Sequence, residues 1–119
     1  MVCDDEPFLR EYVVSILESE GLQVETSFDG QEALEKIQEN PNAYNVLITD
    51  NRMPRLTGIE LVEKVRALKL PLKVIMISGI ELQDTSLRNQ PPDGFLSKTF
   101  TRDELLDCLK TIGCRAGVL

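Results

Sequence analysis

The sequence predicts an α/β fold: a doubly wound parallel sheet of five strands between two layers of helices. Short apolar runs alternate with amphipathic segments along the chain, which is the pattern of repeated strand–helix units. The runs at residues 46–48 and 74–77 are uninterrupted, as in strands buried on both faces. Three helix starts are marked by Asp or Thr followed three residues later by Glu: Asp29 with Glu32, Thr57 with Glu60, and Thr101 with Glu104.

The first part of the chain is expected to contain three strands and two helices. Residues 1–3 fit the end of a strand, and Pro7 suits the first position of a helix that ends at Gly21. Residues 22–26 alternate between apolar and polar side chains, which predicts a half-exposed strand. A helix follows Asp29, and the chain then enters the strand at 46–49. The expected buried positions of the two helices are Leu9, Val13, Ile16, Leu17, Ala33, Leu34 and Ile37.

The remainder is expected to contain two more strands and three helices. Strands are predicted at 74–77 and 94–97, with a short helix between them at 80–89. Longer helices begin after Thr57 and Thr101, and Gly113 closes the last one. Their inward-facing positions are expected to be Leu61, Val62, Val65, Leu68, Leu105, Leu106, Leu109 and Ile112.

Composition and charge narrow the classes of function. The 119 residues suffice for one domain with a hydrophobic core, so residues 1–119 are expected to form a single unit. The net charge of −7 argues against binding of nucleic acid or an anionic membrane. We see no apolar run of membrane-spanning length and no secretory signal peptide. Three Cys without a C-x-x-C pair favour reduced thiols in the cytoplasm, and the lack of His removes a common general base and metal ligand.

Polar residues close several of the predicted strands: Asp4, Asp5, Asp50, Ser78 and Lys98. In a doubly wound sheet the carboxyl ends of the strands converge on one edge, where ligands bind. Each residue alone has an ordinary explanation, as a helix cap, a turn residue or a solvated cation. If there were no site, all of these explanations would have to hold at once for residues at one edge of one sheet, which is a much less frequent situation. We therefore expect these side chains to gather in a site.

Phosphoryl transfer at a divalent cation is the chemistry that suits these residue types together. Carboxylates in one cleft repel one another, and Mg²⁺ resolves that repulsion because it prefers oxygen ligands. A carboxylate can attack phosphorus to give an acyl phosphate, and such transfer needs mainly positioning and neutralisation of the phosphoryl oxygens. The Lys98 ammonium and the Ser78 hydroxyl are suited to bind those oxygens.

This set of residues, with Met53-Pro54 behind Asp50 and Gly79 after Ser78, resembles the receiver domain of two-component response regulators over nearly the whole chain. The resemblance implies a flavodoxin-like fold with strand order 2-1-3-4-5. It implies that Asp50 is phosphorylated from a phosphohistidine on a sensor histidine kinase or a histidine phosphotransfer protein. The implied Mg²⁺ ligands are Asp5, Asp50, Asp4 through water, and the backbone carbonyl of Arg52.

The resemblance also implies a conformational switch. Ser78 and Phe95 match the hydroxyl and aromatic positions that rearrange on phosphorylation and change the surface near the fourth helix and fifth strand. A downstream protein, or a second copy of the chain in a homodimer, is the partner expected at that surface. Nucleic acid and membranes are not expected partners of this domain.

The sequence departs from the family pattern at several points. The first strand is brief, as though shortened at the N-terminus, the segment between Ser78 and Lys98 is short, and Phe95 replaces the common Tyr. Thr99 follows Lys98 where the family generally has a Pro joined by a cis bond. A cis bond before a residue other than Pro costs about 3–4 kcal/mol, so we expect the Lys98–Thr99 bond to be trans.

Three functions remain open from the sequence. The first is a phosphoacceptor module that catalyses only its own phosphorylation and dephosphorylation. The second is a small Mg²⁺-dependent phosphohydrolase with an Asp nucleophile. It is disfavoured because such enzymes normally have a carboxylate two residues after the nucleophile, where this chain has Arg52. The third is an interaction module that is not phosphorylated, which the intact acidic residues and Lys98 disfavour.

Overall fold

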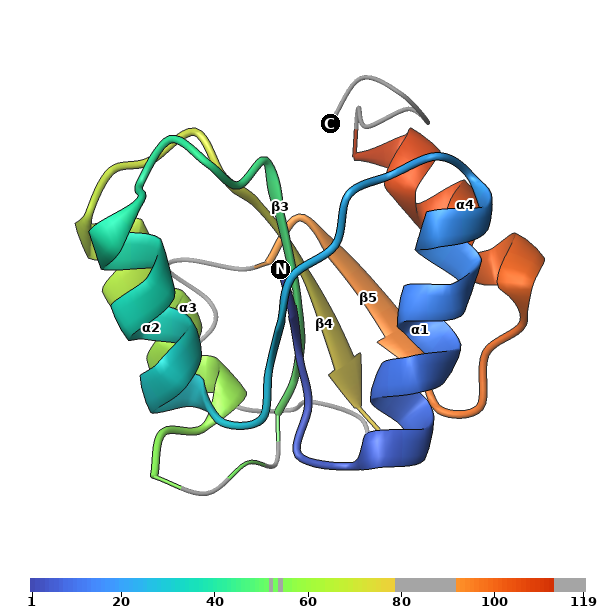
Figure 1. The fold of residues 1–119 in the computed structure, drawn as a ribbon, viewed down its shortest axis with the longest axis horizontal. Coiled ribbons are helices and arrows are strands. Elements are labelled where there is room, and N and C mark those ends of the chain that lie inside the picture. Colours follow the sequence, from blue (N-terminus) through green and yellow to red (C-terminus); the bar gives the residue numbers. More distant parts are fainter. Residues whose placement is uncertain (52, 54, 79–91, 113–119) are drawn as a thin grey trace.

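The computed structural model describes residues 1–51, 53, 55–78 and 92–112 of the chain. Its sheet has five parallel strands in the order β2-β1-β3-β4-β5, with helices on both faces (Figure 1). The strands are β1 (Val2–Cys3), β2 (Thr26–Ser27), β3 (Val46–Asp50), β4 (Lys73–Ser78) and β5 (Gly94–Ser97). The described helices are α1 (Pro7–Ser19), α2 (Gly30–Glu39), α3 (Gly58–Ala67) and α4 (Arg102–Thr111). The predicted fold class and strand order are confirmed.

Two hydrophobic cores lie on the two faces of the sheet. Helices α2 and α3 cover one face, where Leu47 and Met76 point, and α1 and α4 cover the other, where Ile48 and Ile75 point (Figure 1). Each of these four side chains is 2% exposed or less. Successive strand residues point to opposite faces, so burial on both faces explains the uninterrupted apolar runs. None of the described helices combines the length and the apolar character needed to span a bilayer.

The predicted helix starts are present. Thr57 and Thr101 each accept a hydrogen bond from the backbone N–H of the Glu three residues on, and that Glu side chain accepts one in return. Asp29 accepts a 2.8 Å bond from the Glu32 N–H, but the Glu32 side chain lies 3.4 Å from Lys36 Nζ instead of completing the box. These caps satisfy N–H groups that have no partner within the helix.

Two local predictions are wrong. The strand expected at 22–26 is β2, which covers only Thr26–Ser27, because the neighbouring β1 offers only two residues to pair with. Leu68, expected to face inward, follows the last residue of α3 and is 39% exposed. The helix expected at 80–89 and the helix end at Gly113 lie outside the described residues.

The Lys98–Thr99 peptide bond is cis, so the expected trans bond is wrong. The expectation considered only the local preference of the bond. Tertiary contacts fix the chain on both sides of it: Lys98 Nζ lies 3.4 Å from Asp50 Oδ2, and Phe100 is buried in the core. The Tyr12 hydroxyl also donates a 3.3 Å hydrogen bond to the Phe100 carbonyl. The surrounding fold, and not the residue after Lys98, therefore determines the isomer.

Gly58 is expected to be essential for the contact between α3 and β3. A Cβ at this position would lie 2.3 Å from the Asp50 carbonyl oxygen, which is backbone and cannot move aside. Gly58→Ala should therefore lower the free energy of unfolding by about 1–3 kcal/mol in urea denaturation. Alanine is intrinsically the better helix residue, so an unchanged or higher stability would show that the contact is unimportant.

Candidate functional site

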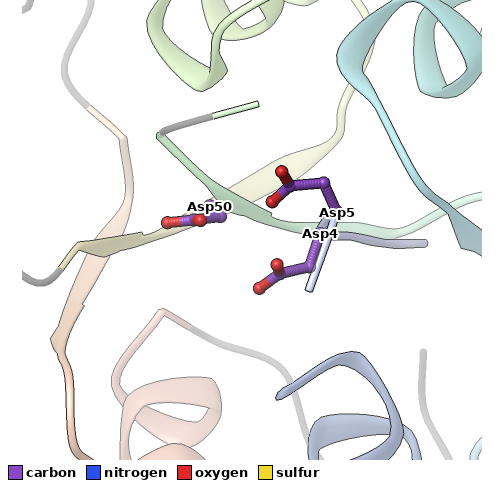
Figure 2. Close-up of side chains that lie close together, drawn as sticks. All are labelled: Asp4, Asp5 and Asp50. Atoms are coloured by element: carbon purple, nitrogen blue, oxygen red, sulfur yellow. The ribbon is translucent and has the colours of Figure 1, made fainter. Parts of the chain in front are cut away.

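Asp4, Asp5 and Asp50 come together where the adjacent strands β1 and β3 end (Figure 2). The register pairs Val2 with Ile48 and Cys3 with Thr49, so the next residues along the two strands are Asp4 and Asp50. One carboxylate oxygen from each of the three residues lies within 4.8 Å of the others. Figure 2 shows the Asp4 and Asp5 side chains turned toward the end of β3. The pairing of two central strands thus creates a cluster of three acidic groups.

Asp4 is the most deeply buried member of the cluster, at 2% exposed. Its Oδ1 accepts a 2.8 Å hydrogen bond from the Glu6 N–H, whereas its Oδ2 is buried without a partner among the described residues. Burial raises the pKa of Asp4 from 3.8 to about 6; the Glu6 N–H opposes this shift, and the nearby Asp50 charge adds to it. A buried acceptor without a donor is a place for a cation or its bound water.

Asp50 is also buried, at 4% exposed, and both of its oxygens have contacts. The Asn51 N–H donates a 2.9 Å hydrogen bond to Oδ1, and Lys98 Nζ lies 3.4 Å from Oδ2. Burial raises the pKa of Asp50, and the Lys98 ammonium opposes that shift. Lys98 Nζ also lies 3.8 Å from Glu6 Oε2. One cation therefore faces several carboxylates, which leaves the site with an excess of negative charge.

The donor set fits Mg²⁺. All of the clustered ligand atoms are carboxylate oxygens, and Mg²⁺ combines one or two carboxylates with several retained water molecules. The unpartnered Asp4 Oδ2 is available to such a water. The described part of the site contains no thiolate or imidazole that would favour a softer metal.

The structure thus gathers Asp4, Asp5, Asp50 and Lys98 in one place, as expected from their positions at strand ends. Ser78 closes β4 opposite Ser97 in the register with β5, but its side chain is outside the described set. Arg52, the predicted carbonyl ligand, also lies outside it. Phe95 pairs with Met76 on β5 and has a side chain that is 52% exposed.

Two residues beside the site were not identified from the sequence. The Asn51 N–H donates a hydrogen bond to Asp50, and the Asn51 side-chain Oδ1 accepts a 3.3 Å bond from the Ile59 N–H in α3. Arg55 makes a two-point ion pair with Asp29. Asp29 itself follows β2 at the same edge of the sheet. Its position after a strand is therefore the sequence signal that could have placed it beside the site.

The model of the response regulator receiver domain family matches residues 1–110. The chain belongs to this family. Receiver domains are the phosphoacceptor modules of two-component signalling, and they occur both in response regulators and within sensor kinases. The chain is 32% identical, over 94% of its length, to the transcriptional regulatory protein CpxR homolog of Haemophilus influenzae and spans 48% of that protein.

Solved receiver structures agree with the fold. The chain is 30% identical to the chemotaxis protein CheY4 of Vibrio cholerae, with a TM-score of 0.84 and coverage of 93% and 94% of the two chains. It is 32% identical to the response regulator TrrA of Thermotoga maritima, solved in complex with Mg(2+)-BeF, with a TM-score of 0.82 and coverage of 93% and 95%. The chain spans 19% to 51% of the first three curated relatives that it matches.

We expect Asp4→Asn to stabilise the metal-free receiver at neutral pH. The pKa of Asp4 is higher in the folded chain than in the unfolded chain, so deprotonation disfavours folding as the pH rises from about 4 to about 6. The variant should gain about 1–3 kcal/mol in free energy of unfolding at pH 7.5 in EDTA, and the gain should vanish near pH 4. Asp5→Asn, at an exposed position, should gain less. Urea denaturation across this pH range measures the difference, and a loss of stability at pH 7.5 would refute it.

Proposed function

We propose that Asp50 accepts a phosphoryl group from phosphohistidine in a Mg²⁺-dependent reaction. The observation that carries the proposal is the burial of the Asp50 carboxylate at the end of the central strand β3, between two further carboxylates and the Lys98 ammonium. Packing alone does not account for this arrangement, because burying several like charges costs free energy. A site for a cation and a phosphoryl group accounts for it.

In the proposed step an oxygen of the Asp50 carboxylate attacks phosphorus while the phosphorus–nitrogen bond of the phosphohistidine breaks. The electron pair of that bond stays on the imidazole nitrogen, which takes up a proton, and the product on this chain is an acyl phosphate. Lys98 is suited to bind a phosphoryl oxygen, because its ammonium already lies 3.4 Å from the Asp50 carboxylate. We also assign the binding of a phosphoryl oxygen to the Ser78 hydroxyl. We assign Phe95 to the conformational switch that follows phosphorylation.

The proposed Mg²⁺ ligands are Asp5, Asp50, the Arg52 carbonyl and, through water, Asp4. The bound cation would neutralise charge on the carboxylates and on the transferring phosphoryl group. The buried and unpartnered Asp4 Oδ2 supports a water-mediated contact. TrrA, solved with Mg(2+)-BeF, supports the assignment through its similar fold and 32% identity.

We infer that the phosphoryl donor is a sensor histidine kinase or a histidine phosphotransfer protein in the cytoplasm. The module then acts through protein contacts, with a downstream protein or a second copy of the chain, and returns to its starting state by catalysing hydrolysis of its own acyl phosphate. Relatives named sensor kinase CckA and sensor histidine kinase RcsC, each 32% identical to this chain, are consistent with a receiver that works close to a kinase.

Beryllofluoride tests the proposed phosphoacceptor, because it forms a non-covalent mimic of the acyl phosphate. We expect a bound signal in ¹⁹F NMR that requires both Mg²⁺ and Asp50 and is lost in Asp50→Asn. Asp107→Asn removes a carboxylate from α4 and should bind like the unmodified chain. Retained binding in Asp50→Asn would refute the assignment. Rapid turnover of a small phosphodonor without an adduct would indicate a phosphohydrolase. Absence of both beryllofluoride binding and phosphodonor turnover would indicate an interaction module.

Lys98→Gln should change the rate of phosphorylation and the affinity for Mg²⁺ in opposite directions. Loss of the ammonium should slow phosphorylation by a small phosphodonor about 100-fold or more, because a preorganised positive group at the transferring oxygens is removed. The same change should tighten Mg²⁺ binding in calorimetry, because a competing cation 3.4 Å from Asp50 is removed. Lys110→Gln, in the last turn of α4, is the matched control and should change neither quantity. If Lys98→Gln instead lowered both the rate of phosphorylation and the affinity for Mg²⁺, Lys98 would act only through the fold.

A further inference from the structure

An ion pair joins the segment that follows Asp50 to the turn before α2. Arg55 lies between β3 and α3, and its Nε and Nη2 donate bonds of 2.9 and 3.0 Å to the two carboxylate oxygens of Asp29. The Asp29 carboxylate is buried, whereas most of the Arg55 side chain is exposed. Two parallel bonds to one carboxylate fix direction as well as distance. The pair therefore holds Arg55 in one orientation against α2.

The same two segments are close-packed at two further points. A Cβ at Gly30 would lie 2.3 Å from the Leu56 carbonyl oxygen, so only glycine allows this approach. Met53 Sδ lies 3.2 Å from the Sγ of Cys3, and that Sγ donates to the Asp29 carbonyl at 3.3 Å. Arg55 and Leu56 thus lie against the turn at residues 29–30, and Met53 is linked to it through Cys3.

The charge of Asp29 is not needed for its role as a helix cap. Its Oδ1 accepts a 2.8 Å bond from the Glu32 N–H, and a neutral Asn caps helices equally well. Arg55 in turn has a φ of 65°, in the left-handed region where Gly or Asn is favoured over a long side chain. Both residue choices are explained by the ion pair.

The start of α3, which follows Arg55, is bonded to the residue after Asp50. The Asn51 N–H donates to Asp50 Oδ1, and the Gly58 N–H donates a 2.9 Å bond to the Asn51 carbonyl. The Asn51 side chain accepts a bond from Ile59 in α3. The Asp50 carboxylate is therefore linked through Asn51 to the start of α3, and Arg55, which lies three residues before Gly58, is held by Asp29.

We propose that Asp29 and Arg55 are positioning residues for the cation and phosphoryl site at Asp50. Their ion pair fixes Arg55 just before α3. Through the Gly58 N–H at the start of α3, and then through Asn51, it sets the Asp50 carboxylate in the orientation that binds Mg²⁺. The inference rests on the proposed function of Asp50. Neither residue is among the proposed ligands of the cation or of the phosphoryl group, so each would act through Asn51.

The test compares Mg²⁺ dissociation constants, measured by calorimetry, for Arg55→Ala, Asp29→Asn and the double variant. We expect each single change to weaken binding about tenfold, as for groups that orient metal ligands. The double variant should be no weaker than the single ones, because either change abolishes the ion pair between the two charges. Arg55→Lys should recover part of the affinity. Asp29→Asn keeps the cap, so its effect cannot come from loss of α2.

Arg102→Ala is the matched control. Arg102 also makes an ion pair, at 2.7 Å to Glu20, and its side chain is about as exposed as that of Arg55, but it joins α4 to the end of α1. It should leave the Mg²⁺ affinity unchanged. In the metal-free chain the amide resonance of Asn51 should shift in Arg55→Ala and Asp29→Asn, and should not shift in Arg102→Ala.

The outcomes separate the two proposals. If the unmodified chain binds Mg²⁺ and beryllofluoride through Asp50 but Arg55→Ala binds Mg²⁺ equally tightly, the positioning role is refuted and the phosphoacceptor assignment stands. If the unmodified chain binds neither, both proposals fail. Additive losses in the double variant, or an equal loss in Arg102→Ala, would also refute the positioning role, since they indicate general destabilisation.

Discussion

The parallel pairing of β1 with β3 is the constraint on which the site depends. Both strands lie inside the sheet, and their register places Asp4 beside Asp50. Neither carboxylate reaches solvent freely, so burial raises the pKa of each. The short β1 holds this arrangement with only two residues, because β2 and β3 both pair with it. The hydrophobic cores on the two faces thus support a local concentration of negative charge.

Several of the described contacts around Asp50 are made by backbone groups. Gly58 allows α3 to begin against the Asp50 carbonyl, and Gly30 allows the turn before α2 to approach the Leu56 carbonyl. The Asn51 N–H then bonds the Asp50 carboxylate directly. Groups held by backbone contacts lose little further freedom when a ligand binds, which is the meaning of preorganisation in such sites. Among the residues that the structure describes, Lys98 reaches Asp50 from the end of the distant strand β5 by a long side chain.

Features determined by nearby residues could be predicted from the sequence, whereas features determined by distant contacts could not. The buried runs of β3 and β4 and the caps at Thr57 and Thr101 depend on spacing within a few residues, and all are present. The cis bond at Lys98 and the pairing of Asp29 with Arg55 depend on residues far apart in sequence. The clustering of the acidic residues could be predicted from their positions at strand ends, because the sheet topology brings those ends together.

The balance of charge explains why both a cation and an anion suit one site. In the described site three carboxylates are clustered, and the Lys98 ammonium lies near one of them and near Glu6, so a divalent cation would reduce the excess of negative charge. With such a cation bound, Lys98 would not have to compensate Asp50 alone and would be free to bind a phosphoryl oxygen. Formation of the proposed acyl phosphate on Asp50 would remove its carboxylate charge and place phosphoryl oxygens in the same volume. The excess charge of the free site and its proposed capacity to carry phosphate would therefore have the same physical origin.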